Sequence, residues 1–286
     1  MGPKRLFGLA VVTAAILSLR SAVASVSDPT PSAGVRNDSS RIGVALLDLD
    51  GQSRKVLHAD ERFAMCSTFK FLAVAAVLQR VDHEKDKLDR FIKYGERDIL
   101  GWAPVTKQHL GEGGMSLEAL CFAAIVYSDN TAANLLLQIL GGPPGLTAYA
   151  RSLGDNITRL DRIEPELNNV THGEARDTTS PMAMLHDMQK ILIGDALSAS
   201  MREKLESWML QNTTGDAMIR AGVPSGWRVG DKTGQNQTGN SNDIALIRRP
   251  DGRAVLLCIY IDAPGEPTER RAKMVADVTR ELIKPD

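Results

Sequence analysis

Residues 67–78 read STFKFLAVAAVL, and this stretch decides how the rest of the chain is expected to fold. After Ser67 the residues are apolar on nearly every side of a helix, and Lys70 is the exception. A helix that is apolar all round belongs in the interior of a protein. The sequence therefore predicts a buried helix over 69–78 that begins just after a serine and carries one lysine.

Strand-like segments lie toward both ends of the chain, on either side of this helix. The first is β-rich and ends at Asp50-Gly51, which is a hairpin-turn signal. The last two are joined by a turn at Pro250-Asp251-Gly252. The predicted strands are 42–49, 228–233, 244–248 and 254–262.

Helices and loops fill the middle of the chain, up to about residue 211. The helical stretch 117–140 has a polar break at Ser128-Asp129-Asn130, and residues 266–283 form a last helix with one apolar face. These parts are joined most simply in one antiparallel sheet built from both chain ends and flanked by helices, with an all-helical lobe inserted between them. The predicted fold class is therefore α/β, of the α+β type.

The N-terminus has the order of a secretory signal peptide. Lys4 and Arg5 precede an apolar run over 6–19, and Ala22-Val23-Ala24 supplies the small residues of a cleavage site. The run is shorter than the roughly 20 residues that a membrane span needs. We expect cleavage after Ala24 and a secreted, periplasmic protein whose mature form has no membrane anchor. An N-terminal core helix is the alternative.

The chain is thus expected to form two lobes behind an N-terminal leader. A cleft between two such lobes is a natural ligand site. The predicted regions are a signal peptide, 1–24, a flexible leader, 25–40, an α/β lobe, 41–63 and 213–286, and a helical lobe, 64–212, with a catalytic loop, 161–177.

The composition argues against several kinds of partner. Hydrophobic residues make up 43% and charged residues 24%, and the formal net charge of −1 gives no reason to expect nucleic acid or an anionic membrane surface. The three cysteines leave at least one thiol unpaired, and no disulfide framework is expected at this length. Cys121 and Cys258 stand in apolar runs, where a buried, inert thiol is the default. No cysteine–histidine spacing matches a zinc site. We expect no metal and no cofactor.

Ser67 and Lys70 are the first candidates for chemistry. Positions three apart on a helix lie on the same face, so the hydroxyl and the amine can meet. A serine hydroxyl becomes a nucleophile when a base takes its proton, and a lysine whose charge is disfavoured by burial can be that base. The N-terminus of the helix also favours a developing oxyanion. The alternative is a capping serine beside a lysine that only extends toward solvent.

Two further patterns lie in the helical stretch and at a predicted strand. Ser128-Asp129-Asn130 either offers hydrogen-bonding side chains to a cleft or forms an internal turn. Lys232-Thr233-Gly234 either binds a carboxylate at a strand edge or marks a strand that leaves the sheet. Each pattern alone leaves both interpretations open.

The long charged loop supplies a fourth pattern. Residues 155–177 are rich in Arg, Asp and Glu, and a loop of this length inside a compact domain is usually functional. Glu164 can activate water as a general base, Asn168 can hold that water, and Arg162 can pair with Asp177 to pin the loop. A solvated charged loop is the alternative.

Taken together, the patterns S-x-x-K, S-D-N, E-x-x-x-N and K-T-G stand in the order found in the class A serine β-lactamases, which the sequence resembles. The resemblance extends from about Ile42 to Leu282. It includes the longer stretches SDNTAANLLL at 128–137 and RLDRIEPELN at 159–168. Chance agreement on that scale is negligible.

The resemblance implies a role for each of these positions. Ser67 attacks the lactam carbonyl, Ser128 passes a proton to the departing nitrogen, and Glu164 directs the hydrolytic water together with Asn168. Whether Lys70 or Glu164 takes the first proton stays open.

The same resemblance assigns the groups that bind the substrate. Backbone N–H groups of Ser67 and Gln235 form the oxyanion hole. Asn130 binds the side-chain amide of the substrate, and Lys232 and Thr233, followed by Gly234, bind its carboxylate.

Some positions depart from the common pattern of the family. Ser241 stands where many members carry a carboxylate-binding arginine, and the resemblance gives that role to Arg271 on the last helix. Trp102 matches an aromatic residue at the mouth of the cleft, although a partly buried core tryptophan is the alternative.

Two cysteine bridges of the family cannot form in this chain. Val74 stands where a partner for Cys121 would be, and Asn236 stands where a partner for Cys66 would be.

The function implied by the resemblance is hydrolysis of β-lactam antibiotics through an acyl-serine intermediate, which confers antibiotic resistance. The expected partner is a small-molecule β-lactam, and the expected state is a monomer. A penicillin-binding D-alanyl-D-alanine peptidase is the alternative, but such proteins lack a deacylation base like Glu164. A non-catalytic lactam sensor normally needs a membrane anchor, and no second apolar span is visible in the sequence.

Overall fold

The computed structural model describes residues 40–50, 53–171 and 173–284. The predicted signal peptide, and the predicted leader apart from Ser40, lie outside these residues. None of the helices within the described ranges is long and apolar enough to cross a membrane.

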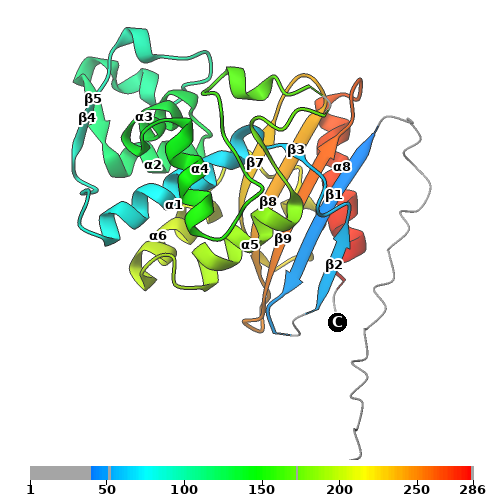
Figure 1. The fold of residues 1–286 in the computed structure, drawn as a ribbon. Helices are drawn as coiled ribbons and strands as arrows, with labels where there is room; N and C mark the ends of the chain where they lie inside the picture. Colours follow the sequence, from blue (N-terminus) through cyan, green and yellow to red (C-terminus); the bar gives the residue numbers. More distant parts are fainter. Residues whose placement is uncertain (1–39, 51–52, 172, 285–286) are drawn as a thin grey trace, which may run out of the picture.

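A five-stranded antiparallel sheet, in the order β2-β1-β9-β8-β7, joins the two ends of the chain (Figure 1). The pairing of β1 with β9 confirms the prediction of one antiparallel sheet that takes strands from both ends. The strands are β1 (Arg41–Asp48), β2 (Arg54–Leu57), β7 (Arg228–Gln235), β8 (Asn240–Arg248) and β9 (Ala254–Asp262).

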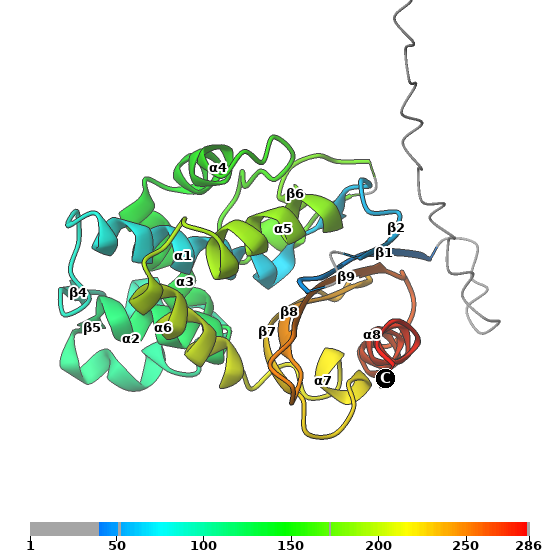
Figure 2. The same ribbon diagram turned by 90° about the horizontal axis from the view of Figure 1, so that it is seen from below.

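Helices cover both faces of the sheet. Figure 2 shows α5 (Pro181–Met188) on one side and α8 (Thr268–Leu282) on the other. Along β9, Leu256 belongs to the apolar core on the α5 side, and its neighbour Leu257 belongs to the core on the α8 side. Because both faces are buried, β8 and β9 are almost continuously buried strands with no exposed face.

Helix α1 (Phe69–Asp82) runs through the larger core, and its residues 69–78 are all buried, as predicted. A 3-10 turn, Cys66–Thr68, precedes it, and the hydroxyl of Thr68 donates to Met65 O at 2.8 Å. This turn packs directly against β7. A Cβ on Gly234 would lie 2.7 Å from Met65 O and 2.9 Å from Ser67 N, so only glycine allows this approach.

The remaining helices form the segment between the two groups of strands. Helices α2 (Leu117–Val126) and α3 (Asn130–Leu140) are separated at the predicted polar break. The segment also contains two short two-stranded sheets that the sequence did not predict, β3 with β6 and β4 with β5. The other elements are α4 (Pro143–Ser152), α6 (Ala199–Leu210), α7 (Ile219–Gly222), β3 (Phe63–Ala64), β4 (Phe91–Lys93), β5 (Gly114–Ser116) and β6 (Thr178–Thr179).

Candidate active site

A cleft of about 420 Å³ brings together most of the residues that the sequence singled out. The amines of Lys70 and Lys232 lie behind its wall, and each contacts residues that form that wall. Arg271 is not among the residues that form the wall. The lining residues are Ser67, Trp102, Ser128, Asn130, Glu164, Asn168, Thr214, Thr233, Gly234, Gln235 and Gln237.

Ser67 and Lys70 are in direct contact, as expected for positions three apart at the start of a helix. Lys70 Nζ lies 2.8 Å from Ser67 Oγ and 3.1 Å from Glu164 Oε1. The amine is fully buried. Burial lowers the pKa of Lys70, and the nearby carboxylate of Glu164 offsets part of that decrease.

The surroundings of the Lys70 amine suit either protonation state. Ser128 O at 2.8 Å and Asn130 Oδ1 at 2.6 Å are both acceptors only, so they take two N–H bonds. In the ammonium form the third N–H bonds Ser67 Oγ. In the neutral form the lone pair faces Ser67 and can accept its proton, which is the geometry that a general base needs.

Glu164 contacts both the hydroxyl of Ser67 and the amine of Lys70. Ser67 Oγ donates to Glu164 Oε1 at 3.4 Å, and Asn168 Nδ2 donates to Glu164 Oε2 at 2.6 Å. Within the described chain, Asn168 Oδ1 is buried and has no hydrogen-bond partner. An unpartnered buried acceptor beside a buried carboxylate is suited to hold a water molecule that the carboxylate deprotonates.

Asn134 on α3 fixes the backbone of Glu164. Its Nδ2 donates to Glu164 O at 2.9 Å, and its Oδ1 accepts from Glu164 N at 3.0 Å. These two bonds attach the catalytic loop to the helix that also carries Asn130. In the sequence, Asn134 stands within the stretch 128–137 and has no spacing that predicts a role.

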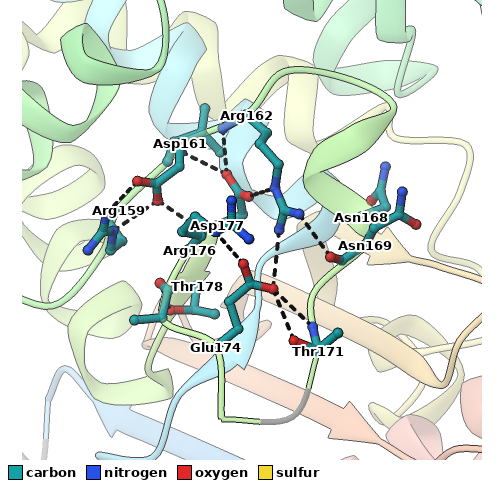
Figure 3. Close-up of polar contacts among 12 residues, drawn as sticks. Arg159, Asp161, Arg162, Asn168, Asn169, Thr171, Glu174, Arg176, Asp177 and Thr178 are labelled. Carbon is teal, nitrogen blue, oxygen red and sulfur yellow. Dashed lines mark hydrogen bonds and ion pairs between the residues drawn. The ribbon is translucent and has the colours of Figure 1, made fainter.

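The ends of the catalytic loop are held together by the predicted pair of Arg162 and Asp177 (Figure 3). Asp177 Oδ2 accepts from Arg162 Nε at 2.5 Å, and Oδ1 accepts from the backbone N–H groups of Asp161 and Arg162. Arg162 also donates to Asn169 O at 3.0 Å. Asp177 is fully buried, and both of its carboxylate oxygens accept hydrogen bonds, which compensates for the loss of contact with water.

Ser128 lies between the two lysines of the site. Its Oγ is 3.3 Å from Lys70 Nζ and 3.1 Å from Lys232 Nζ, and its φ of 56° is in the left-handed region. Lys232 is fully buried, and burial together with the charge of Lys70 lowers its pKa to about 7. A hydroxyl between two amines is well placed to pass a proton in either direction.

Arg271 lies behind the wall of the cleft, on α8. Its guanidinium donates to Ser241 Oγ at 3.2 Å, Asn236 O at 2.8 Å and Thr268 Oγ1 at 3.0 Å. Gln235, which does line the cleft, donates to the same Ser241 hydroxyl at 3.4 Å. The guanidinium is thus separated from the cleft by Ser241 and Gln235.

Trp102 lies at the surface of the cleft rather than in the core. Its side chain is about half exposed, with 56% of its surface accessible, and its indole N–H donates to Tyr127 O at 3.0 Å. The backbone carbonyl of Trp102 accepts from Asn130 N at 2.9 Å. The ring is therefore attached to the same turn that carries Ser128.

The thiols of Cys66, Cys121 and Cys258 are all free and buried, and burial was predicted for Cys121 and Cys258. Burial raises the pKa of each of them, which makes them poor nucleophiles. In the ranges that the structure describes, no group of three or more His, Cys, Asp or Glu side chains is placed to hold a metal ion. The groups that the cleft offers for chemistry are the Ser67 hydroxyl, the Glu164 carboxylate and the two lysine amines behind its wall.

Sequence comparison places these residues in a known family. The model of the beta-lactamase enzyme family matches residues 32–284. The beta-lactamase OXY-2 of Klebsiella oxytoca is 43% identical over 241 residues, which cover 84% of this chain and 83% of that protein. The beta-lactamase CTX-M-8 of Citrobacter amalonaticus is 44% identical over 242 residues, with 84% and 82% covered.

Solved structures agree with this placement. An ancestral class A beta-lactamase, GNCA, superposes with a TM-score of 0.83 at 50% identity and covers 85% of this chain and 93% of its own. The enzyme L2, solved in complex with relebactam, superposes with a TM-score of 0.81 at 45% identity, with 84% and 89% covered. The similarity extends over nearly the whole length of each of these proteins.

Proposed function

The chain belongs to the beta-lactamase enzyme family, whose members hydrolyse β-lactams, and from this premise we propose that Ser67 carries the reaction through an acyl-serine intermediate. The observation that supports this proposal is the contact of one hydroxyl with two bases. Ser67 Oγ lies 2.8 Å from Lys70 Nζ and 3.4 Å from Glu164 Oε1, inside a cleft large enough for a small ligand.

In the first step, Ser67 Oγ attacks the lactam carbonyl carbon, and its proton passes to Lys70 or Glu164. The backbone N–H groups of Ser67 and Gln235 stabilise the oxyanion. When the C–N bond breaks, the nitrogen takes a proton from Ser128 Oγ, and the lysines beside Ser128 replace that proton. The product of this step is an ester on Ser67.

In the second step, water hydrolyses this ester. Glu164 removes a proton from the water, and the unpartnered side-chain oxygen Oδ1 of Asn168 holds the water beside Glu164. Hydroxide adds to the carbonyl carbon, the ester bond breaks, and Ser67 recovers its proton. The ring-opened acid leaves, and the antibiotic is inactivated.

The remaining site residues bind and orient the substrate. Asn130 hydrogen-bonds the side-chain amide, Lys232 and Thr233 attract the carboxylate, and Gly234 leaves room for the substrate along β7. Trp102 packs at the mouth of the cleft. The positive charge of Arg271 attracts the carboxylate from behind the wall of the cleft, with Ser241 and Gln235 between the two groups.

The wider setting of the enzyme is proposed on the same basis. We expect export to the periplasm, because the basic and apolar N-terminus has the order of a signal peptide. We also expect a monomer, and we expect no binding of nucleic acid because the net charge is −1.

The test of this mechanism is mass spectrometry of the chain mixed with a penicillin. Glu164→Gln keeps the shape of the side chain but removes the proton acceptor, so we expect the acyl-enzyme to accumulate and turnover to fall by roughly 10²- to 10⁴-fold. Ser67→Ala is expected to form no adduct. Rapid turnover by Glu164→Gln, with only free enzyme in the spectrum, would refute the role of Glu164.

Glu166→Gln is the matched control, because Glu166 is an exposed carboxylate in the same loop. We expect it to turn over like the unaltered chain. A penicillin-binding D-alanyl-D-alanine peptidase, the alternative function, would keep the adduct even on the unaltered chain. The same spectra therefore distinguish the two functions.

A further inference from the structure

One end of the cleft offers hydroxyl groups rather than cations to an anionic substrate. Of the described residues that line the cleft, none is basic. The Lys232 amine is fully buried and donates to Ser128 Oγ and Thr233 O. The Arg271 guanidinium is held behind Ser241. A carboxylate in the cleft therefore meets hydroxyl donors first, and the positive charges act from behind them.

Two of these hydroxyls are adjacent. Thr214 Oγ1 lies 2.5 Å from Thr233 Oγ1, and both residues line the cleft. Thr233 is the donor in this pair, because the one hydroxyl hydrogen of Thr214 goes to Asn212 Oδ1. Two neighbouring hydroxyls can donate to the two oxygens of one carboxylate, whereas Thr233 alone can serve only one of them.

When the Thr214 hydroxyl turns toward the cleft, it gives up its hydrogen bond to Asn212 but leaves Asn212 with another donor. Asn212 Oδ1 accepts both from Thr214 N at 3.1 Å and from Thr214 Oγ1 at 2.8 Å. If the hydroxyl hydrogen turns to a carboxylate, the backbone N–H still satisfies Asn212 Oδ1. An unpaired buried acceptor is the usual cost of such a change, and this reorientation avoids it.

A buried ion pair holds this segment in place before any ligand arrives. Asp231 accepts from Asn212 Nδ2 at 2.5 Å and from Arg220 Nε at 2.6 Å. A Cβ on Gly215 would lie 1.9 Å from Asp231 Oδ2, so the turn that carries Thr214 lies directly against this carboxylate. A preformed donor loses little freedom when it binds, which favours affinity.

We infer that Thr214 is a carboxylate-binding residue of this enzyme: its hydroxyl and that of Thr233 each donate one hydrogen bond to the carboxylate of the lactam substrate. The inference rests on the proposed function, because it names a substrate contact in the same cleft. Thr233 remains beside Lys232, and Thr214 adds the second donor.

The test compares Thr214→Val with the unaltered chain on benzylpenicillin and on its neutral methyl ester. Valine keeps the shape of threonine and removes the hydroxyl. We expect kcat/KM for the acid to fall by roughly 10- to 100-fold, since a hydrogen bond to a charged group is lost. For the ester, which has no carboxylate, we expect kcat/KM to change by less than about twofold.

Thr214→Ser, which keeps the hydroxyl, is the matched control and is expected to retain the preference for the acid. Thr214→Ala repeats the test if the valine does not fit. Equal kcat/KM of the valine and alanine variants and the unaltered chain on the acid overturns the inference, and so does an equal loss on acid and ester. If the unaltered chain forms no adduct at Ser67 and hydrolyses neither compound, the proposed function itself has failed.

Discussion

Lys232 is a buried amine whose charge depends on pH in the range where the enzyme is expected to work. Its pKa is lowered to about 7, first by burial and then by Lys70, while the nearby Asp231, Asp243 and Glu164 favour the charged form. The ammonium attracts an anionic substrate, and the neutral amine does not. The affinity of the free enzyme for a carboxylate is therefore expected to fall as pH rises through about 7.

This dependence is measured as kcat/KM for benzylpenicillin between pH 5 and pH 10, because kcat/KM reports the titration of the free enzyme. We expect an alkaline decrease with a midpoint near 7. The neutral methyl ester is the control, and its profile lacks the part of the decrease that comes from charge attraction. Identical profiles for acid and ester would rule out Lys232 as the titrating group.

At the level of single residues, the sequence predicted those that belong to a spaced pattern. Ser67 and Lys70 are three apart on a helix, and their contact follows from helix geometry alone. Thr214 and Asn134 were not predicted as site residues. A hydroxyl in a short turn and an amide on a helix have no distinguishing spacing, and only the fold brings Thr214 to Thr233 or Asn134 to Glu164.

The catalytic loop depends on a single buried ion pair at its base. Asp177→Asn keeps an oxygen for the backbone N–H groups of Asp161 and Arg162 but removes the nearer carboxylate from the Arg162 guanidinium, to which the carboxylate of Glu174 remains at 3.7 Å. Removing one partner of a buried pair costs about 3–5 kcal/mol. We expect a decrease of this size in the free energy of unfolding, measured with urea, and slower hydrolysis of the acyl-enzyme.

The pair of Arg159 with Asp161 in the same loop is the comparison. Its arginine is exposed, with 43% of the side-chain surface accessible, so Arg159→Ala is expected to cost less than about 1 kcal/mol. If both variants lose the same stability, the buried pair has no special role in holding the loop.

At the level of elements, the sequence predicted the long strands and helices better than the short or polar ones. β9 was predicted with the bounds observed, because it is a long apolar run. β8 begins four residues earlier than predicted, at Asn240, because its first part carries buried polar residues: Asn242 donates to Ala64 O, and Asp243 accepts from Ile219 N. Strands such as β4, with three residues, are too short to show a period.

The stability of the whole molecule is expected to depend on a buried carboxyl pair that takes no part in the proposed reaction. Asp187 on α5 is fully buried, and burial together with the neighbouring Asp155 raises its pKa to about 9 from an ordinary value of 3.8. Asp155 in turn accepts from Ile157 N and Thr158 N, where the long loop begins. The folded protein therefore keeps a proton at neutral pH that the unfolded chain releases.

The sign of this effect follows from proton linkage. Since the folded state binds the extra proton, the Asp187 contribution to the free energy of unfolding is complete below about pH 4 and is lost as pH rises toward 9. The slope is about 1.4 kcal/mol per pH unit. The asparagine of Asp187→Asn does not titrate. Between pH 5 and pH 8, the free energy of unfolding of this variant, measured with urea, is therefore expected to depend on pH less steeply by about 1.4 kcal/mol per pH unit. Parallel curves would mean that Asp187 is ionised in the folded protein.

The division of the chain into an α/β lobe, 41–63 and 213–286, and a helical lobe, 64–212, remains a proposal. The sheet and α8 support the first part, and the cluster of helices around α1 supports the second. The large apolar core contains residues from both parts, including Phe71 of α1 and Leu256 of β9. Such shared burial favours cooperative unfolding of the two lobes.

The order of strands in the sheet has a consequence for how this protein is made. β1 pairs along its whole length with β9. Ala45, for example, pairs with Cys258, which is synthesised more than 200 residues later, so this pairing cannot form until β9 has been made. A chain made only as far as residue 227 already carries Ser67, Lys70 and Glu164, yet it lacks β7, which borders the cleft, and β9, the second neighbour of β1. We therefore expect a chain that ends before β9 to lack the central strand pairing of the sheet and to be inactive.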